Sequence, residues 1–332
     1  MPPITLNRPL ESSFGSDWIE SMRMPRITLL AVALSALLSQ NVHAINDSAG
    51  TTGFSFLKVG VGARAAGLGG AFTAIRSDIE APAWNPAGLH GLQARTASLA
   101  YTSYLVDTEA GFLSFAMPGG DRTFGVSVNY FNYGDLHRTD ADGQDLGTFS
   151  ASDLAAAVTA TQSLFGGRLS AGGSIKSIHS SIDDYSAAAL AFDLGLLFMG
   201  PLEGMTLGAS IANLGSVYSG YTDGFDDSLP VLLRAGIAHR PAHFPVPLLI
   251  VADFTVPNDN DAYATFGAEI EFGGGLTLRP GYSLQQGGSA GDETLGLSAG
   301  GGLELRSYRV DYAFSSFPDL GDVHRVSLSR RL

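Results

Sequence analysis

The stretch that decides the fold is Phe124-Gly125-Val126-Ser127-Val128-Asn129-Tyr130, in which apolar residues alternate with glycine or polar residues. Successive side chains of a strand point to opposite faces, so this period of two predicts a strand with one apolar and one polar face. The same alternation recurs at 263–272, 295–306 and 308–315. The chain from Ala94 onward is therefore predicted to consist of two-faced strands.

The connections between these strands differ in length at the two ends. Those at 118–121, 165–167 and 273–274 are short, whereas those at 135–148 and 216–228 are long and acidic. Short turns at one end and long loops at the other are typical of a bacterial outer-membrane barrel. We expect fourteen strands, at 94–105, 107–118, 122–134, 149–164, 167–179, 186–199, 205–215, 229–240, 246–256, 261–273, 275–286, 293–306, 307–317 and 323–332.

Other fold classes fit the sequence less well. After the first 44 residues there is no run of about 20 apolar residues, which a membrane-spanning helix needs. A soluble sandwich would not need short loops at one end of its strands and long loops at the other. A propeller would show a repeat of about 40 residues, which is absent. Only 15% of the residues are charged, against roughly 25% in soluble domains. We predict an all-β protein, a transmembrane antiparallel up-and-down barrel of about fourteen strands with an N-terminal segment plugging its lumen.

The beginning of the chain predicts export. Arg23 and Arg26 precede the apolar run 27–38, and Val42-His43-Ala44 supplies the small residues that signal peptidase accepts. This pattern is typical of a secretory signal. We expect a signal peptide region at 1–44 with cleavage after Ala44, and we interpret 1–21 as a mis-called start. The expected location is the bacterial outer membrane.

Several kinds of chemistry are disfavoured. A net charge of −13 argues against nucleic-acid binding, and the absence of cysteine excludes thiolate sites. The dinucleotide-like motif 60–65 is not followed by further βαβ units, and the G-x-S-x-G motif at 296–300 lies within a predicted strand. The histidines lack ligand spacing, and the acidic run 140–145 fits a solvated loop better than a calcium site. We expect a non-enzymatic protein with no catalytic residue, cofactor or metal.

The glycine-rich stretch 50–89 differs from the rest of the chain. Its small residues allow a backbone to pack tightly inside another structure. We expect 45–93 to form a luminal plug, with 63–74 as a short helix, and 94–332 to form the barrel. The predicted plug residues are Phe56, Arg64, Gly67, Gly69, Gly70, Phe72, Trp84, Asn85, Pro86 and Gly88.

Charged residues also occur on the glycine- and serine-bearing face of the later strands. An arginine facing lipid at mid-membrane would cost about 2–4 kcal/mol, so we expect these side chains to point inward. Two roles are open: to hold the plug in place or to line a path for a solute. The predicted luminal charge group comprises Arg234, Asp253, Glu269, Glu271, Arg279, Glu304, Arg306, Arg309 and Asp311.

Three stretches carry a family resemblance. The run 56–74 (FLKVGVGARAAGLGGAFTA) resembles the N-terminal signature of the PorV/PorQ family, and 324–329 resembles its last strand. The run 84–89 (WNPAGL) resembles an element that this family shares with the FadL fatty-acid transporters. The resemblance implies a fourteen-stranded outer-membrane barrel of the FadL-like superfamily, with an N-terminal segment folded into its lumen.

The resemblance also implies a function. Relatives of the PorV type are accessories of type IX protein secretion and surface attachment, so the first hypothesis is such an accessory, with secreted proteins or secretion components as partners. The alternative is a FadL-like channel for long-chain fatty acids or other hydrophobic small molecules. Outer-membrane lipid is the expected surrounding in both cases, and no nucleic-acid partner is expected.

Overall fold

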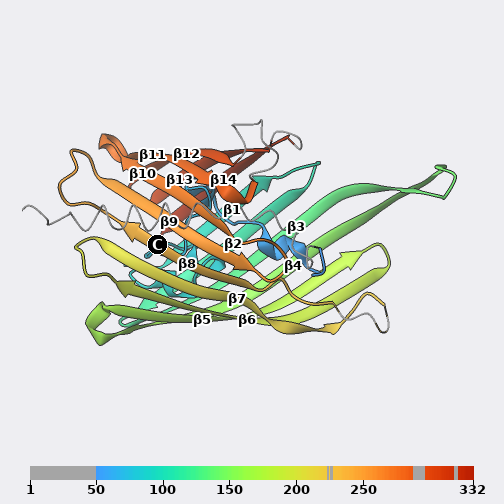
Figure 1. Cartoon of the computed structure of the whole chain (residues 1–332), viewed down its shortest axis with the longest axis horizontal. Helices are drawn as coiled ribbons and strands as arrows, with labels where there is room; N and C mark the ends of the chain where they lie inside the picture. Colours follow the sequence, from blue (N-terminus) through green and yellow to red (C-terminus); the bar gives the residue numbers. More distant parts are fainter. Residues whose placement is uncertain (1–49, 223, 225–226, 287–295, 318–320) are drawn as a thin grey trace, which may run out of the picture. The chain divides into compact units, whose positions relative to one another are not determined.

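The barrel is closed. The computed structural model describes residues 50–222, 224, 227–286, 296–317 and 321–332; the predicted signal region and 45–49 lie outside them. In this part of the chain, fourteen strands each pair antiparallel with their sequence neighbours, and β1 closes the sheet on β14 (Figure 1). The predicted antiparallel up-and-down barrel of about fourteen strands is confirmed.

The strand bounds follow the predicted segments closely, and the largest extensions into expected loops are at β3, β4 and β7. They are β1 (Thr96–Ser103), β2 (Glu109–Gly119), β3 (Arg122–Thr139), β4 (Asp145–Leu164), β5 (Leu169–Ile182), β6 (Tyr185–Met199), β7 (Met205–Ser219), β8 (Leu232–His239), β9 (Leu248–Pro257), β10 (Tyr263–Glu271), β11 (Leu276–Ser283), β12 (Leu297–Leu305), β13 (Tyr308–Phe317) and β14 (Gly321–Arg331). Single 3₁₀ turns occur at η5 (Phe165–Gly167), η6 (Gly273–Gly275) and η7 (Leu284–Gln286).

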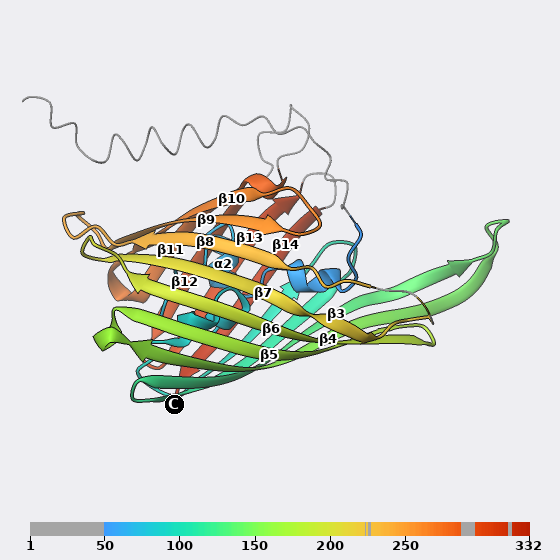
Figure 2. The ribbon, with the colours of Figure 1, turned by 60° about the horizontal axis from the view of Figure 1, so that its bottom comes forward.

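The expectation of a loop at 135–148 is wrong. Strands β3 and β4 pair as far as Thr139↔Asp145, whereas β2 pairs with β3 only as far as Asn132. The β3–β4 hairpin therefore extends beyond its neighbours (Figure 2). Register shifts between Asn132 and Asp135 and between His137 and Thr139 interrupt the alternation. Because of these bulges and the acidic residues, the sequence of this segment does not show the regular alternation that predicts a strand.

The two faces of the barrel have opposite chemistry. Outward-pointing side chains are large and apolar, and Leu113, Val126 and Val158 are 57%, 52% and 61% exposed. Inward-pointing positions carry serine, threonine, glycine and charged residues, many of them buried. This is the arrangement of a barrel whose outer face contacts lipid. Within the described residues, no helix is long and apolar enough to cross a membrane.

Residues 50–93, hereafter the N-terminal segment, pack against the inner wall. The segment contains η2 (Ser55–Lys58), α2 (Ala63–Gly67), η3 (Ala81–Ala83) and η4 (Pro86–Leu89). Leu68 and Phe72 are fully buried in a cluster that includes Leu249 and Val251 of β9. The expected helix at 63–74 is wrong in length, because the helix ends at Gly67 and the chain then turns at Gly69 and Gly70, whose φ angles are +70° and +85°.

The inner wall has glycine where the backbone of the N-terminal segment crosses it. A Cβ at Gly281 of β11 would lie 2.2 Å from the Gly69 nitrogen. At Gly172 of β5 it would lie 2.4 Å from the Ala87 nitrogen. No real Cβ approaches a backbone atom so closely, because packed interiors have no room for an added methyl group. The inner wall of the barrel and the N-terminal segment are therefore complementary in shape.

Two adjacent glycines of β5 test this fit. Gly172→Ala should lower the stability of the folded protein by about 1–3 kcal/mol, because its methyl group overlaps the segment backbone. Gly173→Ala is the matched control, since its Cβ would meet its nearest atom at 3.6 Å, an ordinary contact. The measurement is the urea midpoint of unfolding in detergent micelles, followed by tryptophan fluorescence. Equal midpoints for the two variants would contradict the fit.

Candidate functional site

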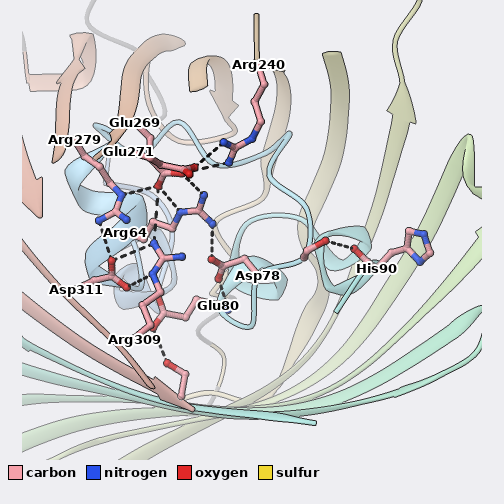
Figure 3. A network of polar contacts seen from close by, with 12 residues as sticks. Arg64, Asp78, Glu80, His90, Arg240, Glu269, Glu271, Arg279, Arg309 and Asp311 are labelled. Carbon is pink, nitrogen blue, oxygen red and sulfur yellow. Dashed lines mark hydrogen bonds and ion pairs between the residues drawn. The ribbon is translucent and has the colours of Figure 1, made fainter. Parts of the chain in front are cut away.

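Arg64 of α2 joins the N-terminal segment to the charged part of the wall. Its Nε and Nη2 donate to Glu269 Oε2 and Oε1 of β10 at 2.8 and 2.7 Å, and its Nη1 donates to Asp78 Oδ2 at 2.9 Å (Figure 3). Such bidentate pairing is the strongest arrangement of an arginine and a carboxylate. Burial lowers the pKa of Arg64, but the carboxylates of Glu269 and Asp78 outweigh burial and raise the pKa above its ordinary value. The guanidinium therefore stays charged.

The contacts continue along the wall. Arg279 Nε donates to Glu269 Oε2 at 2.7 Å, and Arg279 Nη1 lies 2.9 Å from Asp311 Oδ1. Arg309 Nε donates to Asp311 Oδ2 at 2.8 Å. We call the set Arg64, Asp78, Glu269, Arg279, Arg309 and Asp311 the charge cluster.

The charge cluster contains three arginines and three carboxylates, so its formal charge is zero. Arg240 lies 3.4 Å from Glu269 as well, but it pairs with Glu271 at 2.8 Å, so this pair leaves the balance unchanged. Buried ions are tolerated only when they are paired and hydrogen-bonded, so positive and negative groups inside the barrel have to balance. Removing any one member leaves an uncompensated charge. The cluster thus holds α2 against β10, β11 and β13.

Most of the predicted luminal charge group lies on the inner wall. Besides the cluster members, Asp253 Oδ2 accepts hydrogen bonds from the backbone nitrogens of Phe72 and Thr73, both at 2.7 Å. The Arg234 guanidinium lies 5.4 Å from the centre of the Trp84 ring. These wall residues therefore contact the N-terminal segment directly.

The remaining three members of the predicted group lie at strand ends or in a turn. Glu271 is at the end of β10 and pairs with Arg240 at 2.8 Å, while Glu304 pairs with Arg331. Arg306 is wrongly predicted to point inward: it is exposed in the turn between β12 and β13 and has φ +56°. The strand ends at Leu305, so the alternation no longer determines where the next side chain points.

The predicted group leaves out several other ionisable residues that face the lumen, among them Asp78, Glu80, Lys176 and Arg325. Asp78 and Glu80 lie in the irregular part of the N-terminal segment, where no periodicity indicates direction. Arg325 could have been found, because it occupies the same face of β14 as Ser327, opposite Val326 and Leu328. Lys176 of β5, which pairs with Asp193 at 2.7 Å, was overlooked because alternation on that strand is poor.

The predicted plug residues lie at the contact with the wall. Asn85 is fully buried; its Nδ2 donates to the carbonyls of Thr73 and Leu196 at 2.8 and 3.0 Å, and its Oδ1 accepts from the Ala87 nitrogen. Trp84 Nε1 donates to the Val61 carbonyl at 3.1 Å. Residues of the set that are at least nine-tenths buried are Phe56, Arg64, Gly67, Phe72, Asn85, Pro86 and Gly88, and those that are half-buried are Gly69, Gly70 and Trp84. A plugging role remains a prediction.

Two adjoining cavities lie at the long-loop end of the N-terminal segment. The larger, hereafter the outer cavity, has a volume of about 520 Å³ and is lined by the rings of Phe56, Tyr104, Phe131, Tyr133, Tyr263 and Phe317. The smaller, hereafter the inner chamber, measures about 100 Å³ and is lined by Gly69, Trp84 and Arg234. Lys58 and Arg325 line both. The two spaces therefore adjoin.

A third cavity lies at the short-turn end. This short-turn cavity has a volume of about 250 Å³ and is lined by Arg64, Asp78, Glu80 and Arg309, with Thr96 and Arg331 at the strand ends. The residue of α2 that lines the inner chamber is Ala66, which lies on another side of the helix from Arg64. The helix and its charge cluster thus separate an aromatic space from a charged one. In the described residues, no group of three or more histidines or carboxylates could hold a metal ion.

Comparisons with known proteins identify the fold. Residues 30–187 match the profile of an uncharacterised protein family, UPF0164. No curated protein sequence matches the chain. The structure is similar to the toluene transporter TodX of Pseudomonas putida, with a TM-score of 0.61, 15% identity, and coverage of 82% of this chain and 99% of that one. It is also similar to a FadL homologue of Pseudomonas aeruginosa, with a TM-score of 0.54, 12% identity, and coverage of 82% of this chain and 98% of that one.

The barrel shares the fold of these transporters. The FadL-like part of the sequence resemblance is thereby confirmed at the level of the fold. Membership of the PorV/PorQ family stays a prediction, since the matched profile is that of UPF0164.

Two glutamates of β10 test the charge cluster. Glu269→Gln should lower the free energy of unfolding by about 3–5 kcal/mol, because it leaves Arg64 and Arg279 with an uncompensated buried charge. Glu271→Gln is the control on the same face of the strand: its side chain is 42% exposed, and the loss should not exceed about 1 kcal/mol. The readout is urea unfolding in micelles. Similar losses for both variants would refute the cluster as the anchor.

Glu80 should make stability depend on pH. Burial and the Asp78 carboxylate raise the pKa of Glu80 to about 7. The folded protein therefore binds this proton more tightly than the unfolded chain, so the contribution to stability is present below the ordinary pKa of 4.5 and is lost as the pH rises to about 7.

The test compares wild type with Glu80→Gln, which mimics the protonated side chain. Unfolding midpoints should agree at about pH 4, below the ordinary pKa of the glutamate, and the variant should be the more stable protein at about pH 8. If the difference between the unfolding midpoints of wild type and variant does not change with pH, Glu80 has an ordinary pKa in the folded protein.

Proposed function

We propose that this chain is a non-enzymatic outer-membrane channel that admits hydrophobic small molecules. The observation that carries the proposal is the outer cavity, an aromatic space at the long-loop end that meets the N-terminal segment. Binding sites for hydrophobic ligands are concave, lined by aromatic side chains, and contain few polar groups. Its volume of about 520 Å³ is within the range of small-molecule pockets.

The arrangement of the three cavities supports a route along the barrel axis. A solute would enter the outer cavity, pass into the inner chamber and meet α2, where Gly69 and Gly70 line the chamber. Arg64 and the charge cluster hold α2 in the closed position. Displacement of this part of the N-terminal segment would join the chamber to the short-turn cavity, so we propose that 45–93 acts as the plug.

The location follows from the same proposal. An outward apolar face requires lipid around the barrel, and we propose that 1–44 directs the chain to the outer membrane, with the long loops outside and the short turns in the periplasm. The transporters that share the fold have the same closed architecture. They favour the channel over the accessory of secretion that the PorV/PorQ resemblance implies, and the latter stays an untested hypothesis.

Uptake measurements test the channel. A Gram-negative host without its own hydrophobic-solute channel should take up radiolabelled toluene or dodecanoate faster when it expresses this chain. Val59→Trp should slow uptake several-fold, because Val59 lines the outer cavity. Val310→Trp is the control, since Val310 is 44% exposed on the outward face.

Two further observations complete the uptake experiment. Each variant should be recovered in the outer-membrane fraction and migrate faster before boiling than after it, which shows that the barrel is folded. Uptake equal to that of cells without the protein, for every solute, would refute the channel.

A further inference from the structure

An arginine lies on the outward face of the barrel where the sheet closes. Arg330, near the short-turn end of β14, has Tyr308 of β13 and Ala97 of β1 as its register partners. Its guanidinium lies 5.1 Å from the centre of the Tyr308 ring. Arginine and tyrosine at the end of a lipid-facing strand are typical of the level at which lipid chains meet their headgroups.

The next row of outward side chains along the same strands is apolar. Leu328 lies two residues from Arg330 on β14, away from the short turn, and pairs in register with Val310 of β13 and Leu99 of β1. Leu303 of β12 pairs with Val310. These four side chains are 44%, 44%, 56% and 39% exposed. An apolar surface therefore adjoins the Arg330 guanidinium.

Two further arginines lie at this end of the strands. Arg95 immediately precedes β1, and its carbonyl accepts a hydrogen bond from the Leu332 nitrogen at 2.8 Å. Arg306 lies in the turn between β12 and β13, and its carbonyl accepts from Arg331 Nη2 at 2.8 Å. Both side chains are exposed, as is that of Arg330. The fold thus brings three exposed arginines to the short-turn end of β13, β14 and β1.

These three arginines lack carboxylate partners. Within the part of the chain that the structure describes, none of Arg95, Arg306 and Arg330 forms an ion pair. The neighbouring Arg331, by contrast, is paired with Glu304. The surface is therefore positively charged although the whole chain has a net charge of −13. A guanidinium fork matches the oxygens of a phosphate group in geometry and charge.

We propose that this surface binds an anionic phospholipid, with the headgroup phosphate at Arg95, Arg306 and Arg330 and the acyl chains on the apolar row. We call these three arginines and the apolar row the lipid site. A free phosphate ion would contact the arginines alone, whereas a phospholipid contacts both parts, so the lipid is the occupant that fits. The inference goes beyond the channel and requires only that the outward face meets lipid. A lipid held here would fix the level of the closing strands in the leaflet on the short-turn side.

Native mass spectrometry of the full chain, purified in a neutral detergent, tests the lipid site. The probes are phosphatidylglycerol, phosphatidylcholine with the same acyl chains, and inorganic phosphate. Phosphatidylglycerol should bind about fivefold or more tightly than phosphatidylcholine, because each arginine near an anionic lipid surface contributes about that factor. Inorganic phosphate at equal concentration should not displace the lipid.

Variants assign the preference to the three arginines. Arg330→Gln should weaken phosphatidylglycerol binding about fivefold and leave phosphatidylcholine binding unchanged. Arg306→Gln is the second variant and should act in the same direction. Arg168→Gln is the matched control, since Arg168 is also exposed and without a described ion pair but lies at the short turn between β4 and β5. Heat-modifiable migration shows that each variant is folded.

Four outcomes would refute the lipid site. They are equal binding of the two lipids, an equal loss of phosphatidylglycerol binding in Arg168→Gln and Arg330→Gln, and displacement of the lipid by inorganic phosphate at equal concentration. The fourth is a dimer that both Arg330→Gln and Arg306→Gln abolish, which would assign the surface to a second copy of the chain. The channel is tested separately by solute uptake, so either proposal can fail while the other stands.

Discussion

The bidentate contact between Arg64 and Glu269 is the interaction on which the interior of this barrel depends. This buried contact joins α2 to β10. Its two residues belong to a cluster of six charged side chains whose charges sum to zero. A helix of five residues has little stability of its own, so its position must come from contacts with the wall. The cluster supplies a directional contact that apolar packing alone would not, because a guanidinium fork fits a carboxylate in few orientations.

The contact is possible because the wall allows a close approach. Gly67 lies against Gly300 of β12, and Gly69 lies against Gly281 of β11, so backbone meets backbone without an intervening side chain. On the far side of the lumen, Asn85 reaches the Leu196 carbonyl of β6. The N-terminal segment is therefore held at opposite parts of the barrel, by charge at one and by amide hydrogen bonds at the other. Its release would require breaking the ionic contacts at α2, which border the charged cavity.

The cavities divide the lumen by chemistry. Rings such as Phe131 and Phe317 surround the outer space, and ionised groups such as Arg64 and Asp78 surround the short-turn space. A channel for hydrophobic molecules needs the first property for binding and a barrier between the two spaces for selectivity. In the channel that we propose, the charge cluster forms this barrier and leaves the aromatic cavity free, since four of its members line the short-turn cavity and none lines the outer cavity.

The sequence by itself determined the barrel, its strand number and the inward direction of residues such as Glu269, because alternation along a regular strand fixes which face a side chain occupies. It identified the N-terminal segment through its glycines, yet it did not locate the partner of Arg64 or the end of α2. It also failed at Arg306 and across 135–148, where a turn and two bulges interrupt the period. Only the tertiary structure decided that Glu269 binds both Arg64 and Arg279, and that Arg325 faces a chamber without described carboxylates. The contact between Arg64 and Glu269 joins residues 205 positions apart, and its geometry arises from the packing of the N-terminal segment inside the closed barrel, which no local pattern encodes.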